Sequence, residues 1–325
     1  MGAVCGVCGF VCLELPPTVN PGLPDEIYQQ ALDLVEQHGG VMQAAKASGI
    51  TRSTLRNRHD VALRKGMRPT VRIDAPRVYQ RQRLGRMHLV IPDCQVKSGV
   101  PTEHLEWIGN FIYEKRPDVI VCIGDFADMP SLSSYDKGKL AGEGRRYVKD
   151  IAAVHAAMDR LITPFKKDDY KPELHLTLGN HEARIIREVE ENPRYEGRFN
   201  YSDLSYEDFG WRVHDFLKVV EIDQIEYAHY FTTGVMGRPV TSAAAMLRER
   251  QKSCIQGHVQ YTDMAIHRKT QNIGIFSGLC CLHDEEYLGP QGNSNRRQVV
   301  ALYEVEGGKF DPGFISLRFL QKNYA

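Results

Sequence analysis

The stretch DVIVCIGDFAD, residues 118–128, runs from an apolar, strand-like segment directly into a glycine and two carboxylates. Three more segments have the same design: MHLVIP before Asp93-Cys94-Gln95, ELHLTL before Gly179-Asn180-His181-Glu182, and SCIQ before Gly257-His258-Val259-Gln260. Side chains at the carboxyl ends of successive strands converge on one crevice, because the topology of a sheet brings those ends together. Carboxylate, amide and imidazole groups gathered there match the needs of a pair of divalent metals.

These motifs resemble those of the calcineurin-like metallophosphoesterase superfamily. The chain has DxQ, GDxxD, GNHE and GHxQ with a lone His before the last, where the superfamily usually has DxH, GDxxD, GNHE or GNHD, H and GHxH. The resemblance covers residues 87–325 and implies an α/β fold, a two-sheet αββα metallophosphoesterase sandwich. The arrangement also resembles phage-encoded members of the superfamily, which carry a small all-α helix-turn-helix domain at the N-terminus.

Length and charge support a chain of two parts. Its 325 residues suffice for one large domain and a small one. Residues 46–86 hold twelve Lys and Arg against only Asp60 and Asp74, whereas the rest of the chain holds 29 basic and 39 acidic residues. A basic module joined to an acidic body predicts a polyanionic partner for the module and cation binding in the body. We therefore expect a disordered segment over 1–23, a helix-turn-helix domain over 24–65, a basic linker over 66–86 and a catalytic domain over 87–325.

The small domain has the helix spacing of a DNA-binding motif. Apolar periodicity predicts helices from Asp25 to His38 and from Val41 to Ser48, and Thr51 is the expected N-cap of a third helix running to about Lys65. This third helix would be the recognition helix, and arginine and asparagine can make bidentate contacts with guanine and adenine. The alternative is a helical oligomerisation or protein-docking module with a solvated basic face. The residues expected to face a DNA major groove are Arg52, Ser53, Arg56 and Asn57.

The resemblance implies a set of ligands for two divalent metals, bridged by Asp125. The first metal would be held by Asp93, Gln95, Asp125 and Gln260, and the second by Asp125, Asn180, His229 and His258. Both departures from the family pattern, His to Gln, fall on the first metal. Amide oxygens make a harder site than imidazoles, so Mn²⁺ is favoured there, with Mg²⁺, Ca²⁺, Zn²⁺ and Fe as the other candidates. The alternative is a first site that often stays empty while one metal does the work.

The resemblance also implies the catalytic residues. A hydroxide bridging the metals would attack phosphorus, and His181 would stabilise the transferring oxygens or protonate the leaving alkoxide. Asp128 would orient the His181 ring. Arg184, one turn later, is a candidate for binding the substrate phosphate, although a surface arginine is an equally good reading. Met129 stands where the protein Ser/Thr phosphatases of the superfamily have a phosphate-binding arginine, which argues against that class.

Taken together, the sequence predicts a two-metal-dependent phosphoesterase that hydrolyses phosphodiester bonds in nucleic acid. One alternative is a phosphomonoesterase acting on nucleotides or phosphoproteins, and another is a non-catalytic DNA-binding protein with a degraded metal site. We expect DNA as the partner and no membrane association; the sequence leaves the oligomeric state open. Cysteines in apolar segments indicate a reducing cytoplasm, that of a bacterial host if the chain is phage-encoded. A zinc site at Cys5, Cys8 and Cys12 would need a fourth ligand.

Overall fold

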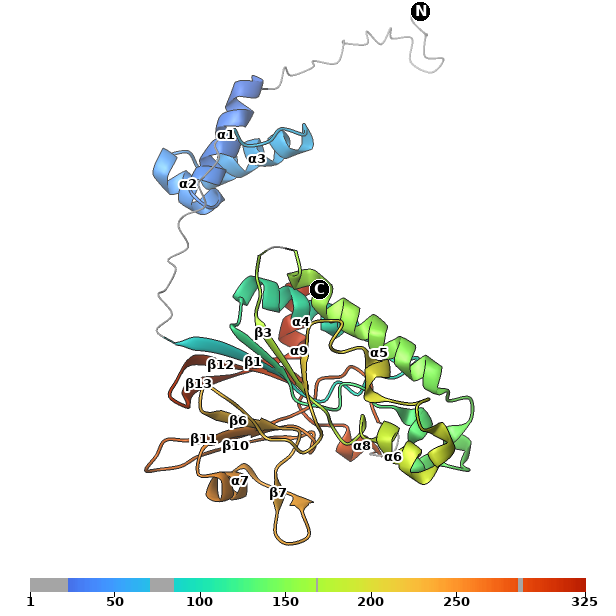
Figure 1. The fold of residues 1–325 in the computed structure, drawn as a ribbon. Helices are drawn as coiled ribbons and strands as arrows, with labels where there is room; N and C mark the ends of the chain where they lie inside the picture. Colours follow the sequence, from blue (N-terminus) through green and yellow to red (C-terminus); the bar gives the residue numbers. More distant parts are fainter. Residues whose placement is uncertain (1–22, 71–84, 168, 286–288) are drawn as a thin grey trace, which may run out of the picture. The chain divides into compact units, whose positions relative to one another are not determined.

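The computed structural model describes residues 23–70, 85–167, 169–285 and 289–325. Of the segment 1–23, which we expect to be disordered, only residue 23 is described, so its cysteines lie outside the described residues. Residues 71–84 of the expected linker also lie outside them. The chain divides into two compact units, Met1–Gln82 and Arg83–Ala325 (Figure 1). No helix among the described residues is long and apolar enough to cross a membrane.

The first unit contains α1 (Asp25–Gln37), α2 (Val41–Ser48) and α3 (Arg52–Arg64). Leu32, Ala44 and Leu55, one from each helix, are almost fully buried. The Thr51 hydroxyl caps α3 by accepting a hydrogen bond from the Thr54 amide at 3.3 Å, as the sequence predicts. Helix α1 ends at Gln37, one residue before the predicted end, because the chain turns at His38 toward Gly39 and Gly40, which both have positive φ.

The second unit is built on two main sheets. One has six strands in the order β13-β12-β1-β2-β3-β4, in which β1 to β4 are parallel and β12 pairs antiparallel with both β1 and β13. The other has five strands in the order β10-β11-β9-β6-β5, with β6, β9 and β11 parallel. The strands of the first sheet are β1 (Arg86–Ile91), β2 (Val119–Cys122), β3 (Glu173–Thr177), β4 (Arg212–His214), β12 (Gln298–Glu306) and β13 (Lys309–Ser316). Those of the second are β5 (Val220–Ile222), β6 (Ile225–Ala228), β9 (Ser253–Gln256), β10 (Thr262–Ile266) and β11 (Ile273–Ser277), and a separate pair is formed by β7 (Thr232–Thr233) and β8 (Arg238–Pro239).

Alternate residues of each central strand belong to different cores. In β1, Leu89 and Ile91 pack with the helices, whereas Val90 lies in a second core shared with the other sheet. In β9, Ile255 joins that shared core and Cys254 faces a third one under helix α7 (Ala243–Arg250). Because successive side chains point to opposite faces of a strand, this alternation defines two stacked sheets, each with a covered outer face.

Three helices cover the outer face of the six-stranded sheet, and α7 lies against the other sheet (Figure 1). The three are α4 (Glu103–Lys115), α5 (Tyr147–Ile162) and α9 (Leu317–Tyr324). Helix α5 passes into a 3-10 turn at Thr163–Phe165, where Pro164 cannot continue the α-helical hydrogen bonds. The remaining elements are α6 (Arg184–Glu191), α8 (Gly289–Gly292) and 3-10 turns at Pro130–Leu132, Ser134–Asp136, Leu140–Gly142, Pro193–Tyr195 and Tyr201–Leu204.

Candidate metal centre

The predicted motif loops follow β1, β2, β3 and β9, and hydrogen bonds join loops of the two sheets. The Gln95 amide donates to the Asp125 carbonyl at 2.9 Å, which ties the β1 loop to the β2 loop. The His258 amide, after β9, donates to Asp93 Oδ1 at 3.1 Å. The site therefore forms where the carboxyl ends of strands from both sheets meet, as the strand-end motifs predict.

Several residues of these loops have an unusual backbone conformation. Gln95, Asp125, His258 and Gln260 have φ of 50°, 49°, 68° and 59°, in the left-handed region that side chains other than glycine rarely adopt. Such conformations cost about 1 kcal/mol or more each and are concentrated at functional sites, where the surrounding structure holds them. Four of the seven candidate ligands therefore have a strained backbone conformation that the surrounding structure must hold in place.

The glycines of the motifs leave room for the ligand side chains. A Cβ atom on Gly179 would lie 2.1 Å from Asp125 Oδ1, and one on Gly257 would lie 2.4 Å from Asp93 Oδ1. These contacts are far shorter than van der Waals distance, so any larger residue would displace the carboxylates. The GN and GH motifs thus have a steric origin in this site.

Four donors converge around the carboxylate of Asp125 and form what we call the second half-site: Asp125, Asn180, His229 and His258. Asn180 Oδ1 lies 2.9 Å from His229 Nε2 and 2.8 Å from His258 Nδ1. His229 Nε2 is 3.3 Å from Asp125 Oδ2. His229 comes directly after β6, and its Nδ1 donates to the Ile123 carbonyl at 3.0 Å, which leaves Nε2 to face the other donors. One carboxylate, one amide oxygen and two imidazoles match a divalent transition metal.

We call the predicted ligands of the first metal, Asp93, Gln95 and Gln260 with the shared Asp125, the first half-site. Asp93 Oδ2 and Gln95 Oε1 are buried and have no hydrogen-bond partner among the described residues. Gln95 Nε2 donates to Asp125 Oδ2 at 3.3 Å, and the Gln260 side chain is also buried. A buried acceptor without a partner costs about 1–3 kcal/mol, so two of them in one loop fit a bound cation.

The charges of the cluster fit the same conclusion. Burial, reinforced by the neighbouring charge of Asp125, raises the pKa of Asp93 to about 7. Burial works against protonation of His229, but the Asp125 carboxylate outweighs it and raises the pKa of His229 to about 9. Burial and the nearby His229 lower the pKa of His258 to about 4. The cluster thus carries buried negative charge from its carboxylates, and protons held on its side chains offset this charge. Divalent cations would offset it in place of those protons.

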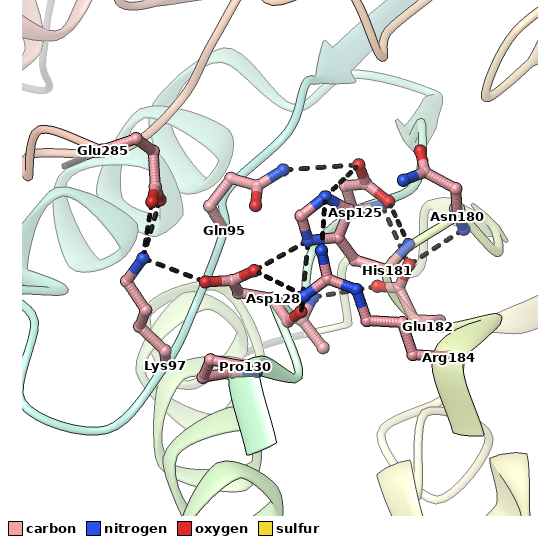
Figure 2. A network of polar contacts seen from close by, with 12 residues as sticks. Gln95, Lys97, Asp125, Asp128, Pro130, Asn180, His181, Glu182, Arg184 and Glu285 are labelled. Carbon is pink, nitrogen blue, oxygen red and sulfur yellow. Dashed lines mark hydrogen bonds and ion pairs between the residues drawn. The ribbon is translucent and has the colours of Figure 1, made fainter. Parts of the chain in front are cut away.

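The candidate catalytic residues lie beside this cluster (Figure 2). His181 Nδ1 is 2.7 Å from Asp128 Oδ1, and the His181 amide donates to Asp125 Oδ1 at 2.9 Å. His181 Nε2 lies 3.7 Å from Asp125 Oδ2, so this nitrogen faces the centre. Arg184 donates through Nη1 to the Asp128 carbonyl at 2.7 Å, and its Nη2 lies 3.4 Å from His181 Nε2. The structure brings the three residues together, with Asp128 against both partners.

Glu182 is a structural member of the site. Its Oε2 accepts from the amides of Asp125 at 3.0 Å and Gly179 at 2.9 Å, and its Oε1 accepts from the amide of Ala127 at 2.8 Å. The carboxylate therefore ties the loop after β2 to the loop after β3. Since these loops carry Asp125 and His181, Glu182 fixes the spacing between a candidate metal ligand and a catalytic candidate.

The candidate DNA-binding residues belong to the other unit. They are Arg52, Ser53, Arg56 and Asn57, all exposed on α3, and with Asp60 they line an open hollow of about 620 Å³. Leu55, between them in the sequence, is fully buried. Helix α3 therefore presents a polar and basic face opposite its packed face, which is the arrangement the sequence predicts.

Sequence reasoning missed Lys97 and Glu285. Lys97 Nζ lies 2.9 Å from Asp128 Oδ2 and 2.8 Å from each Glu285 carboxylate oxygen (Figure 2). Lys97 stands two residues after Gln95, and a single lysine in a loop indicates no particular role. Glu285 follows the last motif by 25 positions and has no local pattern at all.

A second group of metal-type ligands, Cys94, His104 and Cys280, was also not predicted. One ligand atom from each lies within 4.8 Å of the others, and all three residues are buried. His104 Nε2 donates to the Cys280 carbonyl at 2.9 Å, and the Cys94 thiol donates to the Pro92 carbonyl at 3.3 Å. Burial raises the pKa of the Cys94 thiol. With a neutral thiol that donates a hydrogen bond, and with all three residues buried, the group packs as part of the core.

The sequence model of the calcineurin-like phosphoesterase family matches residues 89–263, which is more than half of the chain. The matched range contains every candidate metal ligand and both catalytic candidates. No curated protein matches the chain.

Proposed function

Because the chain belongs to the calcineurin-like phosphoesterase family, we propose that it hydrolyses phosphodiester bonds in nucleic acid with the help of two divalent metal ions. The family indicates a metal-dependent phosphoester hydrolase; the number of metals and the substrate are the parts we add. The observation that carries the proposal is the second half-site, whose four donors lie beside two buried oxygens of the first half-site that have no partner in the described part of the chain.

The two half-sites differ in the metals they suit. The second half-site offers imidazole nitrogens, whereas the first is built for oxygen donors from Asp93, Gln95, Gln260 and Asp125. Oxygen-only sites favour Mn²⁺, Mg²⁺ or Ca²⁺ over Zn²⁺, and we favour Mn²⁺ because it is the transition metal among these three ions. When bound, the two cations would lower the pKa of a water molecule and offset the negative charge of the phosphoryl oxygens.

His181 is placed to supply a proton to the leaving group. Its Nδ1 is directed at Asp128 Oδ1, so the proton on Nε2 faces the centre. Burial opposes protonation of His181, but the carboxylates of Asp125 and Asp128 outweigh it and raise the pKa of the imidazole. In the proposed reaction a water molecule releases one proton to solvent and its oxygen bonds to phosphorus; the ester bond breaks, and the leaving oxygen takes the Nε2 proton of His181, which solvent then replaces.

Arg184 is proposed to bind the substrate phosphate. Its Nη1 is held by the Asp128 carbonyl, which leaves Nη2 near His181 Nε2 at 3.4 Å. A guanidinium fixed by one nitrogen can donate from the other to a phosphoryl oxygen without reordering its side chain.

The first unit is proposed to bind DNA through α3. Arg52, Arg56 and Asn57 are exposed on one face, and this helix begins after a left-handed Gly49 that separates it from α2. Exposed arginines neutralise phosphates and release counterions, while arginine and asparagine can also read base edges. The unit would bring nucleic acid to the catalytic unit.

The activity is tested with a diester and a monoester after removal of metal. Protein treated with EDTA is assayed on bis-p-nitrophenyl phosphate and p-nitrophenyl phosphate with added Mn²⁺, Mg²⁺ or Zn²⁺. We expect no turnover without metal, the highest rate with Mn²⁺ and faster hydrolysis of the diester. Faster hydrolysis of the monoester would instead support a phosphomonoesterase, and no turnover with any metal would leave a non-catalytic DNA-binding protein.

The role of α3 is tested with the double variant Arg52→Ala/Arg56→Ala. We expect its affinity for duplex DNA to fall about 10- to 100-fold, with a weaker salt dependence, because two phosphate contacts are lost. Hydrolysis of bis-p-nitrophenyl phosphate should not change. Lys149→Ala, which removes an exposed positive charge from the second unit, serves as the control. Unchanged DNA affinity in the double variant would contradict the proposal.

A further inference from the structure

We propose that Lys97 and Glu285 are positioning residues for catalysis, which hold Asp128, and through it His181, in the geometry needed to protonate the leaving group. The inference rests on the proposed hydrolysis, since it assigns to these two residues a part in that reaction. Neither residue belongs to a half-site.

The two oxygens of Asp128 have separate partners. Oδ1 contacts His181 Nδ1 at 2.7 Å and Arg184 Nη1 at 3.2 Å, whereas Oδ2 contacts Lys97 Nζ at 2.9 Å. A carboxylate is planar, so the contact on Oδ2 fixes the direction of Oδ1 as well. Without Lys97, the carboxylate can rotate and both oxygens become available to Arg184, which competes with His181 for Asp128.

The ammonium group of Lys97 is fully used by this network. A lysine ammonium has three N–H donors, and Lys97 has contacts with Asp128 Oδ2 and with both oxygens of Glu285. The side chain is only 20% exposed, and those of Asp128 and Glu285 are 7% exposed. Lys97 thus has no donor left for a substrate phosphate, so its action on the reaction must pass through Asp128.

Glu285 both orients Lys97 and offsets its charge. His283 Nε2 donates to Glu285 Oε1 at 2.9 Å, and the Asn293 side chain bonds to the Glu285 amide and carbonyl, each at 2.8 Å. An unpaired Lys97 charge so close to Asp128 would weaken the attraction between that carboxylate and the His181 imidazolium. With Glu285 in place the charges alternate along His181, Asp128, Lys97 and Glu285, and each ionised group faces its opposite.

The test compares two esters that differ only in their leaving group. Lys97→Met, Lys97→Arg and Glu285→Gln are assayed with Mn²⁺ on the p-nitrophenyl and the phenyl ester of thymidine 5′-phosphate. Phenol is the poorer leaving group and needs the proton more. We expect Lys97→Met to lower kcat about 10-fold on the p-nitrophenyl ester and about 100-fold on the phenyl ester, with KM nearly unchanged. Lys97→Arg should restore most of the loss, and the exposed Lys149→Met should match the wild type.

A structural ion pair would behave differently. It would lower the melting temperature and reduce both rates by the same factor, and that result, or no loss at all, would overturn the inference. If Lys97→Met does not fold, Glu285→Gln makes the same comparison, because it removes the charge and keeps the size. Wild-type protein that hydrolyses no ester would refute the proposed function instead.

A measurement that needs no turnover distinguishes a failure of this inference from a failure of the proposed function. In ¹⁵N-histidine-labelled protein, the His181 Nδ1 proton should give a downfield, slowly exchanging signal in the wild type and in Lys149→Met. We expect the signal to weaken or disappear in Lys97→Met. A signal unchanged in Lys97→Met would show that Asp128 holds His181 without Lys97, and would contradict the inference whatever the activity.

Discussion

The two half-sites share Asp125 but are organised differently. In the second half-site every donor contacts another at 2.8–3.3 Å, and hydrogen bonds fix both the Asn180 amide and the His229 ring. In the first, Asp93 Oδ2 and Gln95 Oε1 have no partner among the described residues. A half-site whose donors are already held in place loses less conformational entropy when it binds its ion. Imidazoles also bind transition metals more strongly than amides do. We infer a tight second metal and a labile first one.

The largest effect is expected from Asn180→Ala, because Asn180 Oδ1 contacts both imidazoles of the second half-site. We expect diester hydrolysis to fall about 1,000-fold at any Mn²⁺ concentration, as expected when a metal ligand is lost from a two-metal site. Gln95→Ala, the matched change in the first half-site, should lose activity at micromolar Mn²⁺ and recover most of it at millimolar Mn²⁺. Equal recovery of the two variants would remove the difference between the half-sites.

A smaller effect is expected from restoring imidazoles to the first half-site. The double variant Gln95→His/Gln260→His should bind Zn²⁺ about 100-fold more tightly than the wild type, because two weak amide donors become strong nitrogen donors. Competition with a chromogenic zinc chelator measures this affinity, and Gln95→His alone should lie between the two. Zinc bound equally tightly by the wild type and the double variant would mean that the glutamines do not set the metal preference.

The smallest effect concerns stability beneath the first half-site. Burial lowers the pKa of His104 to about 4, and its Nε2 donates to the carbonyl of Cys280, whose amide donates to the Asp93 carbonyl at 2.8 Å. The folded state therefore holds this imidazole neutral. The stability that depends on a neutral His104 ring is fully present above the unfolded-state pKa of 6.5, and it is lost as the pH falls toward the folded-state pKa of about 4.

We expect the His104 ring to lower the free energy of unfolding by about 2 kcal/mol when the pH falls from 7 to 5. Urea unfolding of the wild type and of His104→Gln across this range measures the difference. The variant should show a flatter dependence of unfolding free energy on pH. Parallel curves for the two proteins would show that His104 is not the titrating group.

Much of the fold and of the site follows from local sequence. The strands before each motif, the Thr51 cap and the helix around Leu55 have short-range signals, because apolar spacing and capping act over a few residues. The ligand sets follow from motifs, although only the family resemblance raises His229 above an ordinary packed histidine. The pairing of the two sheets likewise depended on that resemblance, because no local pattern states which strands become neighbours.

The features that were missed are long-range. Lys97 and Glu285 are 188 positions apart, and Cys94 and Cys280 meet beside an isolated bridge between Asp93 and Leu279, which lie outside the named strands. Neither contact changes the periodicity or composition around its members. Such contacts arise from the packing of distant strands, so a single sequence contains no signal for them.

The most direct test is anomalous X-ray scattering from crystals soaked in Mn²⁺, with data collected above and below the manganese absorption edge. We expect two peaks on either side of the Asp125 carboxylate, one among Asn180, His229 and His258, and a weaker one beside Asp93 and Gln95. Manganese bound elsewhere, with no peak at Asp125, would contradict the assignment of this cluster as the metal centre.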